Sequence, residues 1–252
     1  MDQRRLFIVS SRLPVCIDTG KEQPIRPAST KLVTAIKKYL QGRESFFKEL
    51  SWVGIPGCTP TRWNEGTNTF FESPFTYLPV LVFKEQYRKY HLGFAKSVIW
   101  PLFHGSSSHA FNEDEYEQYK SVNERYAEVL EKKCWENDTI WINDYHLLPL
   151  PGMVRNKFPE AKIEFFLHIP FPSSDLFRLL PGDCKKDILK SLVTADVIHF
   201  NTGNDIENFS RALETVLGYK MEQNVIHLNE RVVEIAVLEN SVVEQSILTG
   251  NS

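Results

Sequence analysis

The sequence predicts an α/β fold built on one doubly wound parallel sheet, and three observations support this prediction. A length of 252 residues suits one large domain or two small ones. Hydrophobic residues make up 42% of the chain and aromatic residues 12%, which supplies a sizeable core and argues against disorder. Short apolar runs alternate with longer amphipathic runs, which is the pattern of βα units on a parallel sheet.

In the first half of the chain, short apolar runs predict buried strands. These runs cover residues 6–10, 51–55, 69–71 and 77–82. Between the first two runs, apolar residues recur at helical spacing before Gly42, which supplies the stop signal. These apolar residues are Leu32, Val33, Ile36 and Leu40. The run at 77–82 is expected to lead into a polar helix that continues through residue 90.

In the second half, helices and strands are expected to alternate. A long acidic helix over residues 113–133 carries apolar and aromatic residues on one side, namely Tyr116, Tyr119, Tyr126 and Val129. Strands are expected at 139–142, 163–167 and 197–200, and helices at 148–158, in two stretches before 195, and at 205–217. Residues 225–228 and 231–238 alternate like strands.

The domain organisation is expected to be simple. No internal repeat, low-complexity tract or linker rich in proline and glycine divides the sequence. We therefore expect one domain over residues 1–238, followed by a frayed tail or short helix over residues 239–252.

Composition excludes several classes of function. Lysine and arginine number 29 against 32 aspartate and glutamate, so a nucleic-acid binder held by a basic field is disfavoured. No apolar run approaches the ~20 residues of a membrane-spanning helix, and the run near the N-terminus is too short for a signal peptide. We therefore expect a cytoplasmic protein without a membrane partner. The four cysteines are far apart and form no CxxC pair, so we expect neither a metal site nor a disulfide framework.

Polar side chains with useful chemistry follow three of the expected strands. Arg12 ends the first strand, while Asp144 and His168 each follow a later one. In an open parallel sheet, ligands bind beyond the carboxyl ends of the strands, where the strand order reverses. Arginine holds a phosphate with paired hydrogen bonds, and aspartate accepts hydrogen bonds from sugar hydroxyls. These residues predict a crevice for a sugar or nucleotide ligand.

Each candidate also has a purely structural interpretation. Arg12 can be a surface ion-pair partner, and Asp144 can cap the helix that follows it. His168 can be a satisfied core histidine, and Trp100 can simply pack. No glycine-rich phosphate loop occurs, and no motif of a zinc protease or serine hydrolase. From the residues alone, both interpretations stay open.

Six sequence blocks resemble the motifs of trehalose-6-phosphate synthases. They keep the family order and cover residues 9–14, 52–57, 98–104, 140–149, 165–172 and 195–202. The block at 165–172, FFLHIPFP, is the most specific match. The resemblance implies a Rossmann-like sheet equivalent to the N-terminal half of a two-domain GT-B glycosyltransferase.

The resemblance also implies an activity and a set of site residues. Such enzymes transfer glucose from UDP-glucose to glucose 6-phosphate with retention and without a catalytic metal, so UDP-glucose is a substrate and no cofactor is expected. By position, Arg12 would bind the acceptor phosphate, Trp100 would form a wall of the acceptor pocket, and Asp144 would contact acceptor hydroxyls. His168 would approach the donor glucose.

The sequence departs from the family pattern at several pocket positions. The paired glycines expected after the first strand fall near Thr30 and Lys31, neither of which permits a close backbone approach. The tyrosine expected nine residues before Trp100, which contacts the acceptor phosphate, is His91. The other departures are Ile55, Asn143 and Gly105. The family's C-terminal domain, with its arginine–lysine pair, does not occur in these 252 residues.

These departures favour a noncatalytic member of the family that regulates or scaffolds a trehalose synthase/phosphatase complex. We assign no catalytic residue and expect this chain to be inactive alone. Its expected partners are other subunits of such a complex or a second copy, together with a phosphosugar ligand. Two alternatives stay open: an N-terminal fragment of an active UDP-glucose:glucose-6-phosphate glucosyltransferase, and a stand-alone phosphosugar sensor.

Overall fold

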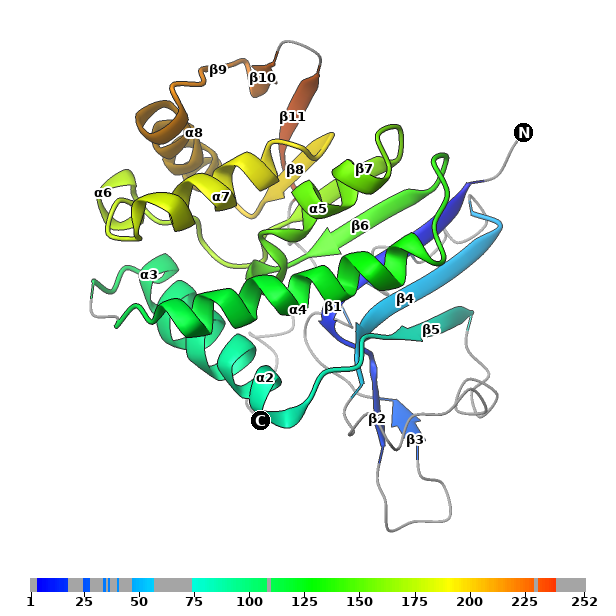
Figure 1. The fold of residues 1–252 in the computed structure, drawn as a ribbon. Helices are drawn as coiled ribbons and strands as arrows, with labels where there is room; N and C mark the ends of the chain where they lie inside the picture. Colours follow the sequence, from blue (N-terminus) through cyan, green and yellow to red (C-terminus); the bar gives the residue numbers. More distant parts are fainter. Residues whose placement is uncertain are drawn as a thin grey trace, which may run out of the picture.

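The computed structural model describes residues 4–17, 25–27, 34, 36, 40, 47–56, 74–107, 110–228 and 231–238. Nine strands form the main sheet in this part of the chain. Within these residues the strand order is β5-β4-β1-β6-β7-β8-β11-β10-β9 (Figure 1). The strands are β1 (Arg5–Arg12), β4 (Glu49–Ile55), β5 (Phe75–Pro79), β6 (Thr139–Asn143), β7 (Lys162–Phe166), β8 (Val197–Phe200), β9 (Met221–Glu222), β10 (Val225–His227) and β11 (Val232–Val237). A separate antiparallel pair consists of β2 (Val15–Ile17) and β3 (Ile25–Pro27).

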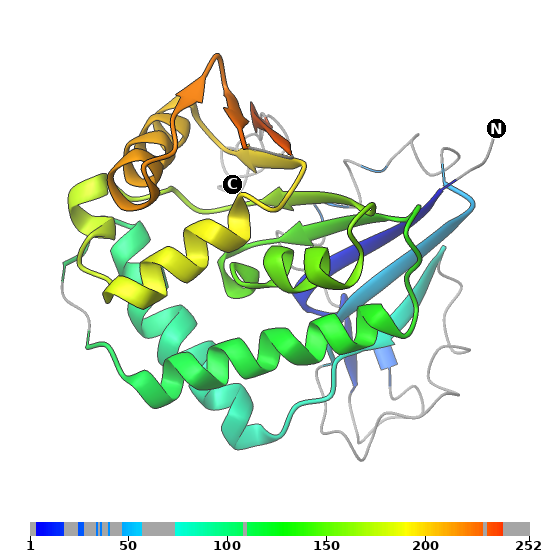
Figure 2. The same cartoon turned by 45° about the horizontal axis from the view of Figure 1, so that its top comes forward.

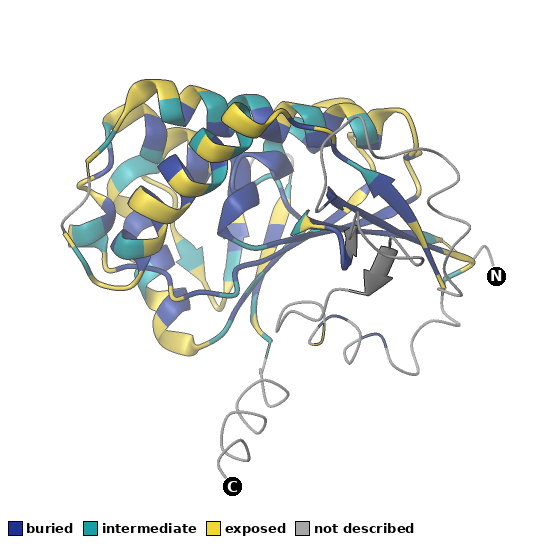
Figure 3. Ribbon diagram, turned by 90° about the horizontal axis from the view of Figure 1, so that it is seen from below, coloured by how far each residue is buried: buried dark blue, intermediate teal, exposed yellow. Residues whose placement is uncertain are grey.

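Helices connect the strands and cover the sheet. They are α2 (Lys84–Tyr87), η4 (Arg88–Ile99), α3 (Trp100–Phe103), α4 (Glu113–Glu131), η5 (Tyr145–Leu147), α5 (Leu150–Lys157), α6 (Ser174–Phe177), α7 (Gly182–Leu192) and α8 (Gly203–Leu217). The helices α4, α5, α7 and α8 pack side by side over one face of the sheet (Figure 2). Their outer sides are exposed, while the strands beneath are buried (Figure 3).

Two helices show how the local sequence sets helix ends. The side chain of Asn112 accepts a hydrogen bond from the Glu115 N–H at 3.2 Å and so caps α4, whose first turn is acidic. Thr202 and Asp205 form a reciprocal capping box at the start of α8. That helix ends at Gly218, where a φ of 73° favours glycine.

The strand order reverses beside β1, in the middle of the sheet. From β1 the chain moves outward to β4 and β5, and it then returns to add β6, β7 and β8 on the other side of β1, all in parallel. The carboxyl ends of β1 and β6 therefore flank a topological switch point, where ligands bind in sheets of this kind. The predicted parallel α/β sheet is confirmed, and β10 and β9 extend it in antiparallel directions.

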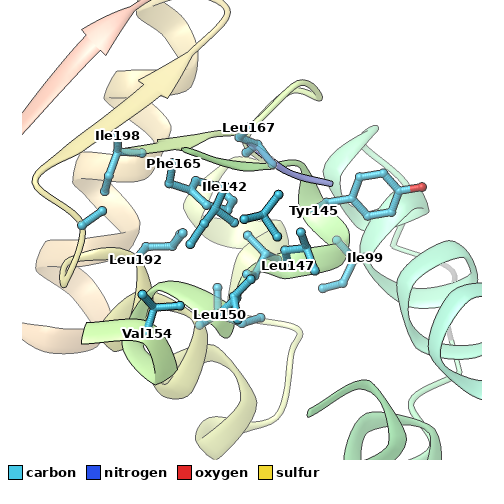
Figure 4. Packing of buried hydrophobic residues seen from close by; sticks show 14 of the residues in the cluster. Ile99, Ile142, Tyr145, Leu147, Leu150, Val154, Phe165, Leu167, Leu192 and Ile198 are labelled. Atoms are coloured by element: carbon cyan, nitrogen blue, oxygen red, sulfur yellow. The ribbon is translucent and has the colours of Figure 1, made fainter. Parts of the chain in front are cut away.

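The sheet is buried on both faces because its strands are apolar at successive positions. In β1, Phe7 and Val9 contact the core beneath the helices, whereas Leu6 and Ile8 belong to a second cluster on the opposite face. Alternation along a strand sends neighbouring side chains to opposite faces. Figure 4 shows the first core, in which Ile142 and Phe165 of the sheet meet Leu150 of α5 and Leu192 of α7. The second cluster includes Ile36 and Leu40, which come from the stretch predicted to be helical.

One part of the first half differs from the prediction. The strand expected at 77–82 runs from Phe75 to Pro79, because Val80 and Val82 are buried outside the sheet. The polar helix expected to end at residue 90 instead continues through η4 and α3 to Phe103. The expected strand at 69–71, the residues Thr30 and Lys31, and the tail at 239–252 lie outside the described residues.

A polar cluster holds the amino ends of β7 and β8. The buried guanidinium of Arg155 donates hydrogen bonds to four backbone carbonyls, at 2.7–3.4 Å, and to Asp196 at 2.8 Å. The carbonyls belong to Phe158, Pro159, Ala161 and Thr194. Asp196 also accepts hydrogen bonds from the Ile163 N–H and from Arg231. The cluster satisfies backbone groups where two strands begin.

Candidate functional site

The predicted site residues gather at the carboxyl ends of the central strands. Arg12 is the last residue of β1, Asp144 follows β6, and His168 lies two residues beyond β7. His91 and Trp100 come from the long helical segment of η4 and α3, which packs against η5 directly after Asp144. The structure thus brings the five predicted residues to the switch point of the sheet.

A backbone irregularity sets the position of Arg12. The pairing of β1 with β4 shifts between Val9 and Arg12, and the Ser10 hydroxyl donates to the Arg12 carbonyl at 2.7 Å. Gly54 of β4 permits this path, because a Cβ there would lie 2.6 Å from the carbonyl carbon of Arg12. The Tyr126 hydroxyl from α4 donates to the Ser10 or Ser11 carbonyl, at 3.1 and 2.9 Å. These contacts hold the exposed guanidinium at the crevice.

Among the described residues, the hydrogen-bond partner of the Arg12 side chain is a tyrosine hydroxyl. Arg12 Nε donates to the Tyr87 hydroxyl at 2.9 Å, and Nη2 also contacts that oxygen. The surface ion-pair interpretation gains no support here. Sequence reasoning missed Tyr87, although its position four residues before His91 is the helical spacing that places two residues on one face.

The helix geometry explains how His91 and Trp100 share one side of the crevice. Nine residues make 2.5 turns of an α-helix with 3.6 residues per turn, which would put the two residues on opposite faces. The η4 segment is π-helical, and the Trp100 N–H donates to the Ala95 carbonyl five residues earlier. Because a π-helix has more residues per turn than an α-helix, nine residues span roughly two turns. Both side chains consequently face the η5 segment.

Stacked rings join the helical segment to η5. The His91 ring lies between those of Tyr87 and His146, with centroid distances of 5.1 and 4.8 Å. His91 Nδ1 and His146 Nε2 are 2.9 Å apart and share a hydrogen bond. Trp100 stacks on His104 at 3.9 Å and lies 5.5 Å from the Tyr145 ring, yet 41% of its surface is exposed. Trp100 therefore packs and also presents a ring to the crevice.

Asp144 has an unusual backbone conformation and an unsatisfied oxygen. Its φ is 81°, which is uncommon for aspartate, and its N–H donates to the Phe166 carbonyl at 2.8 Å. Its side chain makes no capping hydrogen bond to η5, so the helix-cap interpretation is wrong. Among the described residues the buried Oδ1 has no hydrogen-bond partner, and Oδ2 is 3.7 Å from His146 Nδ1. Burial acts to raise the pKa of Asp144, but His146 and His168 outweigh it and lower that pKa.

Asn143 fixes the protonation of His168. The buried Asn143 amide nitrogen lies 3.3 Å from the Val9 carbonyl and 3.1 Å from the Trp141 carbonyl, so its Oδ1 faces His168 Nε2 at 2.9 Å. Because Oδ1 only accepts, Nε2 carries the proton and Nδ1 is left as an acceptor. Burial lowers the pKa of His168 to about 4, so the ring is neutral near pH 7. The satisfied-histidine interpretation is thus supported for Nε2.

The free energy of unfolding is expected to decrease as the pH is lowered from 6.5 to 4. The pKa values of His168 and His91 are both lowered to about 4 in the folded state, so the unfolded chain takes up these protons first. Each group that stays neutral in the folded state contributes up to about 1.4 kcal/mol per pH unit in this window. Urea unfolding across this range should show that His168→Gln reduces the slope of the unfolding free energy against pH. The exposed control His227→Gln should leave that slope unchanged. An equal slope in both variants contradicts the prediction.

In the part of the chain that the structure describes, no group of three or more His, Cys, Asp or Glu side chains is arranged to hold a metal ion. No helix there is long and apolar enough to cross a membrane.

The strand order, with its reversal beside β1, is that of the N-terminal domain of a GT-B glycosyltransferase, and solved structures share it. The N-terminal domain of the Candida albicans trehalose-6-phosphate phosphatase is 25% identical and has a TM-score of 0.78, over 95% of this chain and 48% of that one. A Burkholderia xenovorans alpha,alpha-trehalose-phosphate synthase solved with glucose-6-phosphate is 26% identical, with a TM-score of 0.75 over 93% of this chain and 50% of that one.

The sequence comparisons identify the family. The profile of glycosyltransferase family 20 matches residues 4–250, and the chain belongs to this family. The bifunctional trehalose-6-phosphate synthase/phosphatase of Thermoproteus tenax is 37% identical over 92% of this chain and 32% of its own length. The synthase of Schizosaccharomyces pombe is 32% identical over 93% of this chain and 46% of its own. The chain thus spans about a third to a half of the length of these curated relatives.

Proposed function

We propose that this domain binds a phosphosugar at the crevice and acts as a noncatalytic, regulatory or scaffolding part of a trehalose synthase/phosphatase complex. One observation carries the binding proposal: an exposed Arg12, a half-exposed Trp100 ring and a buried carboxylate oxygen of Asp144, which has no donor among the described residues, lie around the carboxyl ends of β1 and β6. The guanidinium suits a phosphate, the ring suits a sugar face, and the carboxylate suits sugar hydroxyls.

The noncatalytic role is supported by the pocket chemistry. Asn143 uses its amide to bridge two strand carbonyls and His168, and His91 is tied to His146. Both side chains therefore serve the internal structure of the crevice. The matched relatives extend well beyond the length of this chain. The complex that we propose is cytoplasmic and has other subunits as partners.

Titration calorimetry tests the binding proposal. Glucose 6-phosphate and trehalose 6-phosphate should each release or absorb heat at millimolar concentration, with one site per chain. Arg12→Gln should weaken binding about tenfold or more, since hydrogen bonds to charged groups contribute roughly 1.5–3 kcal/mol. Arg178→Gln removes another exposed arginine, which pairs with Asp175 on α6, and should leave the affinity unchanged. Equal affinity in both variants would place the ligand elsewhere, and no heat with either sugar contradicts the proposal.

A second candidate is an N-terminal part of an active UDP-glucose:glucose-6-phosphate glucosyltransferase. The 37% identity to a bifunctional synthase/phosphatase favours it. The full gene product, incubated with UDP-glucose and glucose 6-phosphate, distinguishes the two. Release of UDP with formation of trehalose 6-phosphate supports the enzyme, whereas binding without turnover supports the noncatalytic role.

A further inference from the structure

A polar pocket of about 420 Å³ lies at the amino ends of β7, β8 and β11. Lys162 begins β7, Asp196 directly precedes β8 and Arg231 directly precedes β11, and all three residues line the pocket. These strands are parallel, so their amino ends meet at one edge of the sheet, opposite to the edge that carries the crevice. The pocket is therefore separate from the proposed phosphosugar site.

Arg231 has no carboxylate of its own in the part of the chain that the structure describes. Its Nη1 donates to Asp196 Oδ1 at 3.1 Å, but Asp196 also pairs with the buried Arg155 at 2.8 Å. The third cation of the pocket, Lys162, pairs with Glu164 at 2.8 Å. Two guanidinium groups thus share one carboxylate, which leaves a positive charge on this side of the pocket without a counterion.

One edge of the Arg231 guanidinium is open to a ligand. Nη2 reaches the Pro159 carbonyl only at 3.5 Å, and Nε has no hydrogen-bond partner among the described residues. The edge formed by Nε and Nη2 matches the two oxygens of a carboxylate, which it can hold with parallel hydrogen bonds. Because 28% of the Arg231 side chain is exposed, an anion can reach it from solvent.

The neighbouring guanidinium strengthens the positive field at this edge. Burial lowers the pKa of Arg155, Asp196 acts to raise it, and the charge of Arg231 lowers it further. Like charges that lie close together repel each other, and an anion between them reduces that repulsion. A ligand on Arg231 would therefore also stabilise the charge of Arg155.

The exposed Glu160, which lines the same pocket, selects among anions. Its carboxylate accepts hydrogen bonds from hydroxyl groups but repels a second negative charge. A single carboxylate is therefore favoured over a phosphate dianion. The pocket is also larger than a carboxylate group, since about 300–1,000 Å³ is the range of pockets that hold whole small molecules.

We propose that this pocket binds a small hydroxylated monocarboxylate. The carboxylate lies on the Nε–Nη2 edge of Arg231, and a hydroxyl group of the ligand donates to Glu160. This site goes beyond the proposed function and does not depend on it, because Arg12 and the other crevice residues lie at the opposite edge of the sheet.

Two-dimensional ¹H–¹⁵N NMR of the unaltered chain tests the site. Sodium gluconate, a monocarboxylate with several hydroxyl groups, is titrated against sodium chloride of equal ionic strength. The amide signals of Lys162, Arg231 and Val232 should shift saturably at millimolar gluconate, whereas those of Asp144 and His168 at the crevice should not. Sorbitol, the matched polyol without a carboxylate, should shift none of them, and inorganic phosphate should bind more weakly than gluconate.

Three variants identify the group that holds the carboxylate. Arg231→Gln should weaken gluconate binding about tenfold or more, because it removes the charged fork. Val232→Glu adds a negative charge at a pocket position that is 52% exposed, so it should weaken binding several-fold without disturbing the interior. Arg211→Gln, which removes a 68% exposed arginine on α8, should leave the affinity unchanged.

Several results would overturn this site. They are the absence of a saturable shift in the unaltered chain, equal shifts with sorbitol, tighter binding of phosphate, and undiminished affinity in Arg231→Gln or Val232→Glu. If Arg231→Gln does not fold, Val232→Glu alone decides. None of these results bears on glucose 6-phosphate binding at Arg12, which is measured separately.

Discussion

Replacing Arg155 with methionine is expected to lower the free energy of unfolding by about 3–5 kcal/mol. The substitution keeps the aliphatic volume of the side chain but removes its guanidinium. Four backbone carbonyls then lose a donor, and the Asp196 side chain keeps Arg231 and the Ile163 N–H as its partners among the described residues. Buried groups left without a partner lose the full free energy of their hydration, which makes this loss larger than that of a typical surface ion pair.

Lys157→Met is the matched control, because Lys157 lies on the same helix and also pairs with a carboxylate. Its partner Glu131 is 53% exposed, so the loss should stay below about 1 kcal/mol. Urea unfolding monitored by circular dichroism compares the two variants. A loss in Arg155→Met that is no larger than that in Lys157→Met would show that the cluster is dispensable.

Gly54→Ala is expected to destabilise the domain and to weaken phosphosugar binding together. A Cβ at Gly54 would lie 2.6 Å from the Arg12 carbonyl carbon and 2.7 Å from the Leu13 nitrogen. These atoms are backbone, so β1 must move away from β4 at the position that holds the guanidinium. Overpacking of this kind typically costs about 1–3 kcal/mol or more, and a displaced Arg12 should lower the affinity for glucose 6-phosphate about tenfold.

Gly203→Ala provides the comparison for this variant. Gly203 begins α8, where an added Cβ meets no atom within 4 Å, so alanine should be neutral or slightly stabilising. Unfolding and calorimetry are measured on both proteins, and affinity is compared at a temperature at which each is folded. A Gly54→Ala protein with unaltered stability would contradict the backbone clash. Unaltered affinity in a destabilised protein would show that the clash does not displace Arg12.

The strands were predictable because burial on both faces leaves a strong apolar signal. The expected strand at 197–200 coincides with β8, and the other long strands of the sheet differ by one to three residues at their ends. The prediction ended the helix that reaches Phe103 too early. Its buried positions Tyr90, Phe94 and Val98 lie four residues apart, which is helical spacing that the prediction did not follow past residue 90.

The site was partly predictable for a comparable reason. Arg12, Asp144 and His168 follow strands, and the topology of a parallel sheet brings strand ends together. His91 and Trp100 depended on the family resemblance, because their shared face exists only with the wider turns of η4. The ring stack with Tyr87 and His146 joins side chains that lie 59 positions apart at its extremes, and no local pattern in the sequence encodes such a contact.

The Arg155 cluster and the crevice lie at opposite ends of the same strands. A strand of five residues, such as β6 or β7, separates them by about 17 Å, and substitutions so far apart are usually additive in free energy. Apart from Gly54, the residues that secure the fold are therefore different from the candidate site residues. Side chains at the carboxyl ends of the strands can consequently change while the scaffold is kept.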